Sequence, residues 1–169
     1  MRTHKQINDR AIRYRGEILN ELMMLEKFID VYITDYFTNS DEDKSYEMEL
    51  LILGDNRISF ENKRQIFHFL AEKYDNAWYT SYKSIRYLSS KKNSIPMNKD
   101  LIYIIEQRNV LAHRVLNMDE VALSDDEGIT FLTFKNELSG VRFTEQTFME
   151  LKEMIQKLTK YFFGKRNSQ

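Results

Sequence analysis

The sequence of 169 residues contains no cysteine, one proline and five glycines. Without cysteine the protein cannot form disulfides, thiolate zinc sites or a cysteine nucleophile, and this composition suits a reducing cytoplasm. Because proline and glycine interrupt helices, their scarcity favours long helices over a turn-rich β protein. The sequence also lacks a signal-peptide pattern and any apolar run near the roughly 20 residues that span a bilayer. We therefore expect a cytoplasmic protein that does not cross a membrane.

Charge of neither sign is in large excess, since the formal net charge is -1. No global basic field would therefore attract nucleic acid. Cations nevertheless gather near the N-terminus, at Arg2, Lys5, Arg10, Arg13 and Arg15. The 30% of charged and 42% of hydrophobic residues are typical of a globular protein. The length predicts a single domain over residues 1–169.

Apolar residues at alternating steps of three and four predict a first helix over residues 5–37. This stripe consists of Ile7, Ala11, Tyr14, Ile18, Leu22, Leu25, Ile29, Tyr32 and Tyr36. Further helical segments are expected at 46–53 and 78–88, together with helices capped by Ser59, Asn98 and Thr144. The buried side of the helix that Asn98 caps is expected to be Leu101, Ile104, Ile105, Ala112 and Val115.

The hydrophobic period changes after Leu116. Residues 121–123 and 129–135 are expected to form two short strands around a polar turn, and residues 141–143 to add a third. The predicted fold class is therefore mainly all-α. We expect an up-and-down bundle of four to six helices with a small β-hairpin inserted before the last helix.

One helix carries a candidate catalytic motif, Arg108-Asn109-Val110-Leu111-Ala112-His113. Positions four apart share a helix face, so Asn109 lies in line with His113, and Arg108 points about 100° to the side. His113 can transfer a proton near neutral pH. Arg108 offers a planar fork to phosphate oxygens, and Asn109 can orient the imidazole or touch a phosphate. These residues suit attack of a ribose 2′-hydroxyl on its neighbouring phosphorus without a metal.

The motif resembles the R-x(4–6)-H signature of HEPN proteins, in the variant where Asn follows Arg. The segments 16–17, 25–27, 59–63 and 143–144 resemble one bacterial HEPN-like subgroup. The resemblance implies a helical protein that dimerises through the motif helix and combines two Arg and two His in one site. It also implies a metal-independent endoribonuclease in a toxin–antitoxin or phage-defence setting, with RNA as substrate and an antitoxin protein as partner. Arg108 would bind phosphate, Asn109 would be its polar neighbour and His113 the general acid or base.

A second copy is also suggested by the chemistry, since one imidazole cannot comfortably act as base and acid across an in-line reaction. Two alternatives stay open. In the first, the chain is a catalytically inactive HEPN-fold module that binds a protein or nucleotide partner. In the second, the protein is purely structural, and Arg108 and His113 merely pair with nearby carboxylates. Cations at a helix C-terminus are favoured by the macrodipole alone. No metal or cofactor is expected, because no histidine spacing or glycine-rich loop indicates one.

Aromatic and basic side chains alternate over residues 78–87, a pattern that can stack bases and hold phosphates. Trp78, Tyr82 and Ile85 fall at helical spacing and are expected in the core. The predicted RNA contacts are therefore aromatic and basic residues of this segment outside that core set, together with the neighbour of the catalytic His. They are Tyr79, Lys83, Arg86 and Arg114.

Overall fold

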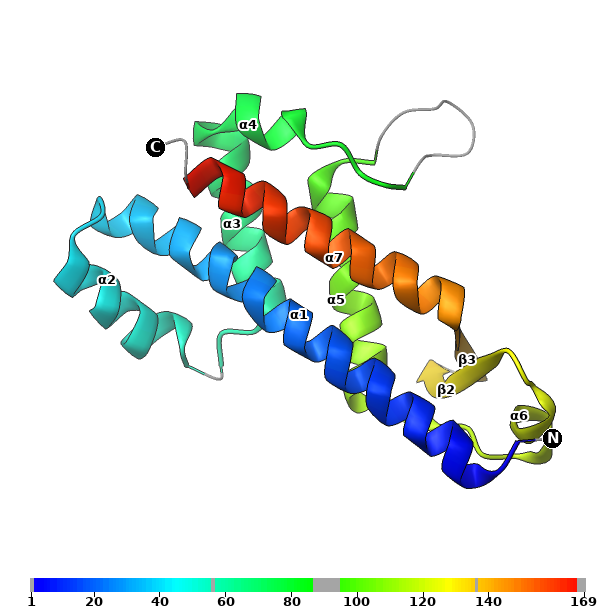
Figure 1. Ribbon diagram of the computed structural model, residues 1–169. Helices are drawn as coiled ribbons and strands as arrows, with labels where there is room; N and C mark the ends of the chain where they lie inside the picture. Colours follow the sequence, from blue (N-terminus) through cyan, green and yellow to red (C-terminus); the bar gives the residue numbers. More distant parts are fainter. Residues whose placement is uncertain (1, 56, 87–94, 136, 167–169) are drawn as a thin grey trace. The chain divides into compact units, whose positions relative to one another are not determined.

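The computed structural model of the protein describes residues 2–55, 57–86, 95–135 and 137–166 (Figure 1). Its helices are α1 His4–Thr38, α2 Glu42–Met48, η1 Glu49–Leu53, α3 Phe60–Tyr74, α4 Asn76–Ser81, α5 Met97–His113, α6 Glu120–Ser124 and α7 Glu145–Arg166; η1 is a π-helix. Its strands are β1 Val115–Leu116, β2 Gly128–Lys135 and β3 Glu137–Thr144. The predicted fold class is confirmed: the chain is mainly helical, with an antiparallel hairpin before the last helix. Within these ranges, no helix combines the length and apolarity needed to cross a membrane.

The chain divides into two compact units. The sheet unit comprises Met1–Leu22 and Glu106–Gln156, and the helical unit comprises Met23–Ile105 and Lys157–Gln169. The boundaries fall inside α1, α5 and α7, so each of these helices contributes one part to each unit. The assignment of residues 1–169 to a single domain stays a prediction.

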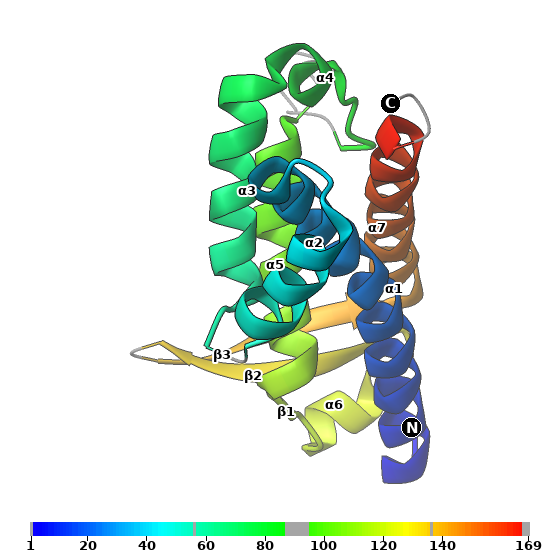
Figure 2. The ribbon, with the colours of Figure 1, turned by 90° about the vertical axis from the view of Figure 1, so that its left-hand side faces the viewer.

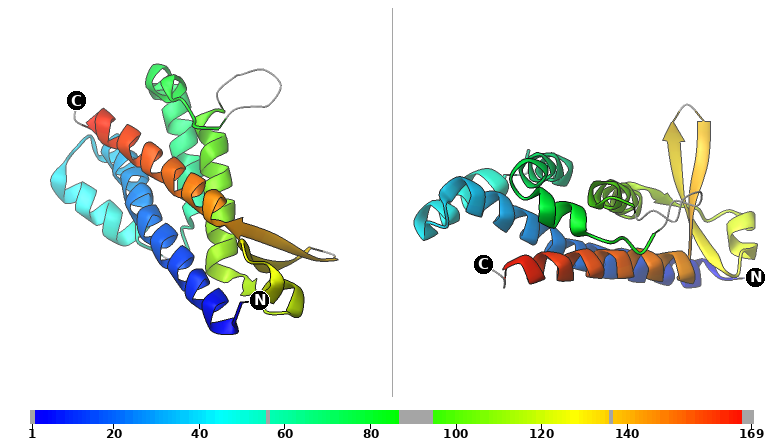
Figure 3. Two further views of the ribbon diagram at one scale, coloured as in Figure 1. Left: turned by 45° about the vertical axis from the view of Figure 1, so that its right-hand side comes forward. Right: turned by 90° about the horizontal axis from the view of Figure 1, so that it is seen from above.

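The sheet unit is built on aromatic packing between two helices and a small sheet. The strands run in the order β1-β2-β3 (Figure 2), and the register places Ile129 opposite Phe143 and Phe131 opposite Val141. Ile129, Phe131 and Phe143 are buried on the same sheet face, as the strand alternation requires. On the helices, the Tyr14 ring stacks on Phe148 with centroids 4.1 Å apart. Figure 3 shows the β2–β3 hairpin extending away from the first part of α1 and the start of α7.

The helical unit has an aromatic core around Phe67, which is fully buried on α3. Tyr32, Trp78 and Phe162 pack on it with ring centroids 5.1, 6.3 and 5.1 Å away. The start of α5 lies beside α3 (Figures 2 and 3), and Arg64 of α3 donates a hydrogen bond to Asn98 of α5. These rings come from α1, α3, α4 and α7, so burial of one aromatic cluster holds four segments together.

Local capping chemistry explains most of the confirmed boundaries. The hydroxyl of Ser59 accepts from Asn62 N at 3.2 Å at the start of α3, and that of Thr144 accepts from Thr147 N at 3.2 Å at the start of α7. Both helices therefore begin where the sequence predicts. The first helix also matches its prediction, except that Tyr36 at its end is exposed while Ile33 is buried.

Three local predictions are wrong. Residues 121–123 form part of α6 and not a strand, because the Asp119 carboxylate caps this turn by accepting from Ala122 N at 2.8 Å. The helix expected at 78–88 ends at Ser81, and residues 82–86 are not helical; its last two residues lie outside the described ranges. Asn98 is inside α5, where its side-chain oxygen accepts from Arg64 and is not used as a cap.

Candidate functional site

The predicted catalytic residues lie at the C-terminal end of α5, in the sheet unit. The helical hydrogen bonding closes where Arg114 N donates to Val110 O at 3.0 Å, and Val115 then pairs with Leu132 in the sheet. Leu111 is fully buried and anchors this last turn. The expected buried residues here are corrected accordingly: Val115 is 70% exposed and Ala112 is only half-buried.

Arg15 of α1 fixes the end of the motif helix. Its Nε donates to Leu111 O at 2.7 Å and its Nη2 donates to Arg114 O at 2.9 Å. The guanidinium carbon also lies 5.0 Å from the centre of the Phe131 ring. Carbonyls in the last turn of a helix lack intrahelical partners, and a cation there also complements the helix dipole. One side chain thus ties both residues that flank the Ala112–His113 dipeptide to α1.

The motif side chains reach solvent. His113 and Asn109 are exposed and Arg108 is half-buried. Arg108 Nη1 donates to Asn109 Oδ1 at 3.0 Å, so the amide oxygen holds the guanidinium and not the imidazole. Among the described residues, neither Arg108 nor His113 has an ion-pair partner. The interpretation in which both merely pair with carboxylates therefore has no support in that part of the chain.

This arrangement provides two chemical functions next to each other on one helix. The exposed imidazole of His113 can serve as a proton acceptor or donor. Among the described residues, the guanidinium of Arg108 donates to Asn109 and keeps further N–H donors for a ligand, and such a planar fork binds phosphate oxygens. Because Asn109 Oδ1 accepts this hydrogen bond, the side-chain amide of Asn109 is held in one orientation, and its N–H groups remain as donors. Arg114 is exposed beside them and can add a further phosphate contact.

The other predicted RNA contacts belong to the helical unit, and one of them is wrong. Tyr79 is only 6% exposed, so its ring is part of the core and not of a stacking surface. The ring packs edge-on against Phe67, and its hydroxyl lies 2.8 Å from Nδ1 of His68. Burial raises the pKa of the Tyr79 hydroxyl, as expected for a phenol in an apolar environment. Of the residues expected in the core, Tyr82 is buried, while Trp78 and Ile85 are half-buried.

Arg86 and Lys83 differ in what they can offer a ligand. Arg86 donates Nε and Nη2 to Asp100 Oδ1 at 2.9 and 2.7 Å, and Asp100 is fully buried. Tyr82 donates its hydroxyl to the second carboxylate oxygen at 2.9 Å. Arg86 is therefore committed to a structural ion pair, whereas Lys83 is exposed. Of these two cations, it is Lys83 that presents its charge to solvent, as the sequence predicts.

Two features of the structure were not predicted from the sequence. Arg15 was noted only as one of several N-terminal cations, and its contact with Leu111 joins segments 96 positions apart. Lys63 is buried between the carboxylates of Glu26 and Asp30, again from segments distant in the chain. Neither has a local sequence signal, because each depends on long-range packing.

The residues described by the structure include no group of three or more His, Asp or Glu side chains placed to hold a metal ion. No protein-family model matches the chain, and no curated protein or solved structure is significantly similar to it. The resemblance to HEPN proteins therefore stays a prediction from the motif and the segments that carry it.

Proposed function

We propose that this chain is a metal-independent endoribonuclease of HEPN type that acts as a homodimer. The observation that carries the proposal is the last turn of α5, where an exposed His113 follows the hydrogen-bonded Arg108–Asn109 pair by one helical turn. Acid–base capacity and phosphate affinity are then combined on one accessible helix end.

In the proposed reaction, His113 acts as the base and removes the proton from a ribose 2′-hydroxyl. The 2′-oxygen forms a bond to the adjacent phosphorus while the bond from phosphorus to the 5′-oxygen breaks. Arg108 binds the non-bridging phosphate oxygens and stabilises their increasing negative charge. A proton returns to the departing 5′-oxygen, so the products are a 2′,3′-cyclic phosphate and a 5′-hydroxyl end.

The returning proton requires a second acid on the opposite side of the phosphorus. A two-fold partner that contacts α5 would supply its own His113 for this step, because a symmetric interface presents the same residues twice. The exposure of His113 and Asn109 leaves this helix end accessible to such a partner. A toxin–antitoxin or phage-defence setting, with an antitoxin protein as a further partner, is proposed from the resemblance.

A catalytically inactive binding module is the second candidate. Two observations favour it: the formal net charge is -1, and Tyr79 and Arg86 are used inside the fold and not on a nucleic-acid surface. Such a module would keep the helix end as a dimerisation or protein-binding surface without cleaving RNA.

Cleavage of single-stranded RNA in EDTA distinguishes the two. We expect the wild-type protein to give products with 2′,3′-cyclic phosphate ends and His113→Ala to lose this activity at least a hundredfold, in line with the usual contribution of a general acid or base. His4→Ala is the matched control, because His4 is also exposed on a helix of the same unit. Equal cleavage by His113→Ala and the wild type would refute the proposed nuclease. Absence of cleavage by a folded wild-type dimer would favour the binding module.

A further inference from the structure

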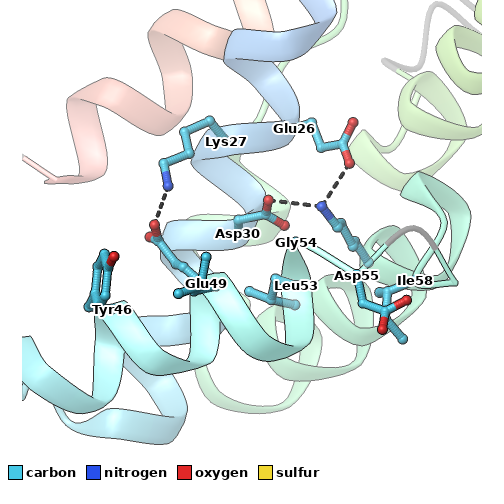
Figure 4. A pocket seen from close by; sticks show the side chains of 11 residues that line it. Glu26, Lys27, Asp30, Tyr46, Glu49, Leu53, Gly54, Asp55 and Ile58 are labelled. Atoms are coloured by element: carbon cyan, nitrogen blue, oxygen red, sulfur yellow. Dashed lines mark hydrogen bonds and ion pairs between the residues drawn. The ribbon is translucent and has the colours of Figure 1, made fainter.

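A cavity of about 440 Å³ lies in the helical unit, bordered by α1, the α2–η1 segment and the start of α3 (Figure 4). Its volume falls in the range of roughly 300–1,000 Å³ typical of small-molecule sites. The charged residues that line it are Glu26, Lys27, Asp30, Glu49, Asp55 and Lys63. None of these belongs to the motif on α5, so the cavity is a separate candidate for ligand binding.

The most buried of these side chains is Lys63, which is only 6% exposed. Its Nζ donates to Glu26 Oε1 at 2.8 Å and to Asp30 Oδ2 at 2.9 Å. In Figure 4 the carboxylates of Glu26 and Asp30 turn toward one shared nitrogen. Removing an ammonium group from water costs several kcal/mol unless such partners surround it. A buried ammonium group with a high desolvation cost therefore lies at the wall of the cavity.

Asp30 is incompletely satisfied. Its Oδ2 accepts from Lys63, but Oδ1 is buried and accepts no hydrogen bond from any described residue. Burial raises the pKa of this carboxyl group, with the opposing effect of Lys63 smaller. Buried polar atoms without partners are uncommon and costly. A positive charge placed in the cavity would offset this cost through its field, without having to touch Oδ1.

The balance of charge determines which sign of ligand fits. Lys27 donates to Glu49 across the cavity, as Figure 4 shows, so both lining ammonium groups already have carboxylate partners. Asp55 is paired with Arg57, which is exposed. The remaining lining charges are three carboxylates against two ammonium groups, a formal balance of -1. Among the described lining residues, an anion would find no ammonium group without a carboxylate partner, whereas a cation would find under-compensated carboxylates.

The wall that carries Glu49 is unusual in its backbone. Residues Glu49–Leu53 form the π-helix η1, which directs Glu49 and buried Leu53 to the cavity. π-Helical turns are rare and occur frequently at functional sites. Leu53, Ile58 and Tyr46 add apolar surface beside the carboxylates. A ligand with a charged head and a short aliphatic chain would satisfy both parts of this lining.

We propose that the cavity binds a small organic cation, namely a primary ammonium or guanidinium group on a short aliphatic chain. The charged head lies between Glu26 and Glu49 and neutralises the excess negative charge around Lys63. The chain lies against Leu53 and Ile58. This site does not depend on ribonuclease activity, because all its residues are in the helical unit and none is assigned to catalysis.

The test is isothermal titration calorimetry of the full chain with agmatine, which carries both head groups on a four-carbon chain. We expect saturable 1:1 binding, and no binding of glutarate, an anion of similar length. Glu49→Gln should weaken agmatine binding about tenfold, as expected for the loss of one charged hydrogen-bond acceptor. Glu47→Gln is the matched control, because it changes the same charge at an exposed position of the neighbouring α2.

Folding is checked for each variant by circular dichroism and thermal melting. Among the described residues, Glu49 forms its ion pair with Lys27, which is exposed, so Glu49→Gln is expected to fold. Asp30→Asn perturbs the buried Lys63 and is less suitable. The proposal is overturned if the folded wild type shows no saturable binding of agmatine at millimolar concentration. It is also overturned if Glu47→Gln weakens binding as much as Glu49→Gln, or if glutarate binds and agmatine does not.

Discussion

Arg15 and Leu111 are joined by a hydrogen bond of 2.7 Å, from the guanidinium Nε of α1 to the last fully buried residue of the motif helix. The same guanidinium donates to Arg114 O. This pair of contacts connects the basic N-terminal helix with the end of α5. Its role is to position the turn that carries His113, since the hydrogen bonds of Arg15 reach the backbone on either side of that turn.

Replacing Arg15 by Ala should therefore loosen the end of the motif helix. Two hydrogen bonds from a charged donor are lost, and we expect the free energy of unfolding to fall by about 2–3 kcal/mol. Hydrogen exchange of the amides near His113 should accelerate more than exchange in the hairpin. Lys5→Ala removes the same charge from an exposed position of the same helix and should change neither quantity appreciably. Equal effects of the two substitutions would contradict a positioning role.

The link between Tyr14 and Phe148 predicts a second stability effect. Both rings are fully buried and stack 4.1 Å apart between α1 and α7. Phe148→Ala leaves a cavity against Tyr14 and should destabilise the fold by about 3–5 kcal/mol in chemical denaturation. Met149→Ala, at the exposed adjacent position, should cost less than about 0.5 kcal/mol. A small loss from Phe148→Ala would mean that this packing does not hold the sheet unit together.

Asp125 gives a prediction for the dependence of stability on pH. Arg142 donates to both of its carboxylate oxygens, at 2.7 and 2.9 Å, and holds the pKa of Asp125 well below its usual range. Backbone N–H groups of Gly128 and Glu127 act in the same direction. Because the folded-state pKa lies below the unfolded value near 3.9, the stabilisation is complete above about pH 5 and is lost as pH falls further.

Asp125→Asn should accordingly be less stable than the wild type at pH 7, and the difference should shrink as pH decreases from about 5 to 3. Urea denaturation at a series of pH values measures this. Asp126→Asn, which changes an exposed neighbouring carboxylate, is the control and should give a nearly constant difference. A difference between Asp125→Asn and the wild type that does not vary with pH would refute the assignment.

The parts of the fold that were predictable are those with local signals. The period of α1 and the hydroxyl caps at Ser59 and Thr144 are encoded within a few residues. These predictions were confirmed, apart from the exposed Tyr36 at the end of α1. The prediction for 121–123 was wrong, although Asp119 two residues earlier is a cap signal, because a three-residue apolar run does not by itself distinguish strand from helix.

The candidate site was only partly predictable for the same reason. The shared face of Asn109 and His113 follows from helix geometry, and both are exposed. The burial of Tyr79 does not follow, because it depends on packing against Phe67 of α3. The helical period that placed Tyr79 on the surface included Ile85, which lies beyond the end of α4 at Ser81. Contacts such as Arg15 with Leu111 depend on packing between distant segments, which neither period nor spacing indicates.

Arg86 and Lys83 finally allow a structural cation to be separated from a ligand-binding one. Arg86 neutralises the fully buried Asp100, so Arg86→Ala leaves a buried carboxylate that still accepts from the hydroxyl of Tyr82 but has lost its guanidinium partner. Breaking such a pair typically costs about 3–5 kcal/mol, and because Arg86 itself is partly exposed we expect the lower end of this range. Lys83→Ala should change the free energy of unfolding by less than about 0.5 kcal/mol, since Lys83 is exposed.

If RNA binds this segment, Lys83→Ala should weaken binding and reduce its salt dependence, whereas Arg86→Ala should act mainly through stability. Denaturation and RNA titration of both variants provide the comparison, and a fully stable Arg86→Ala with impaired RNA binding would return Arg86 to the set of ligand contacts.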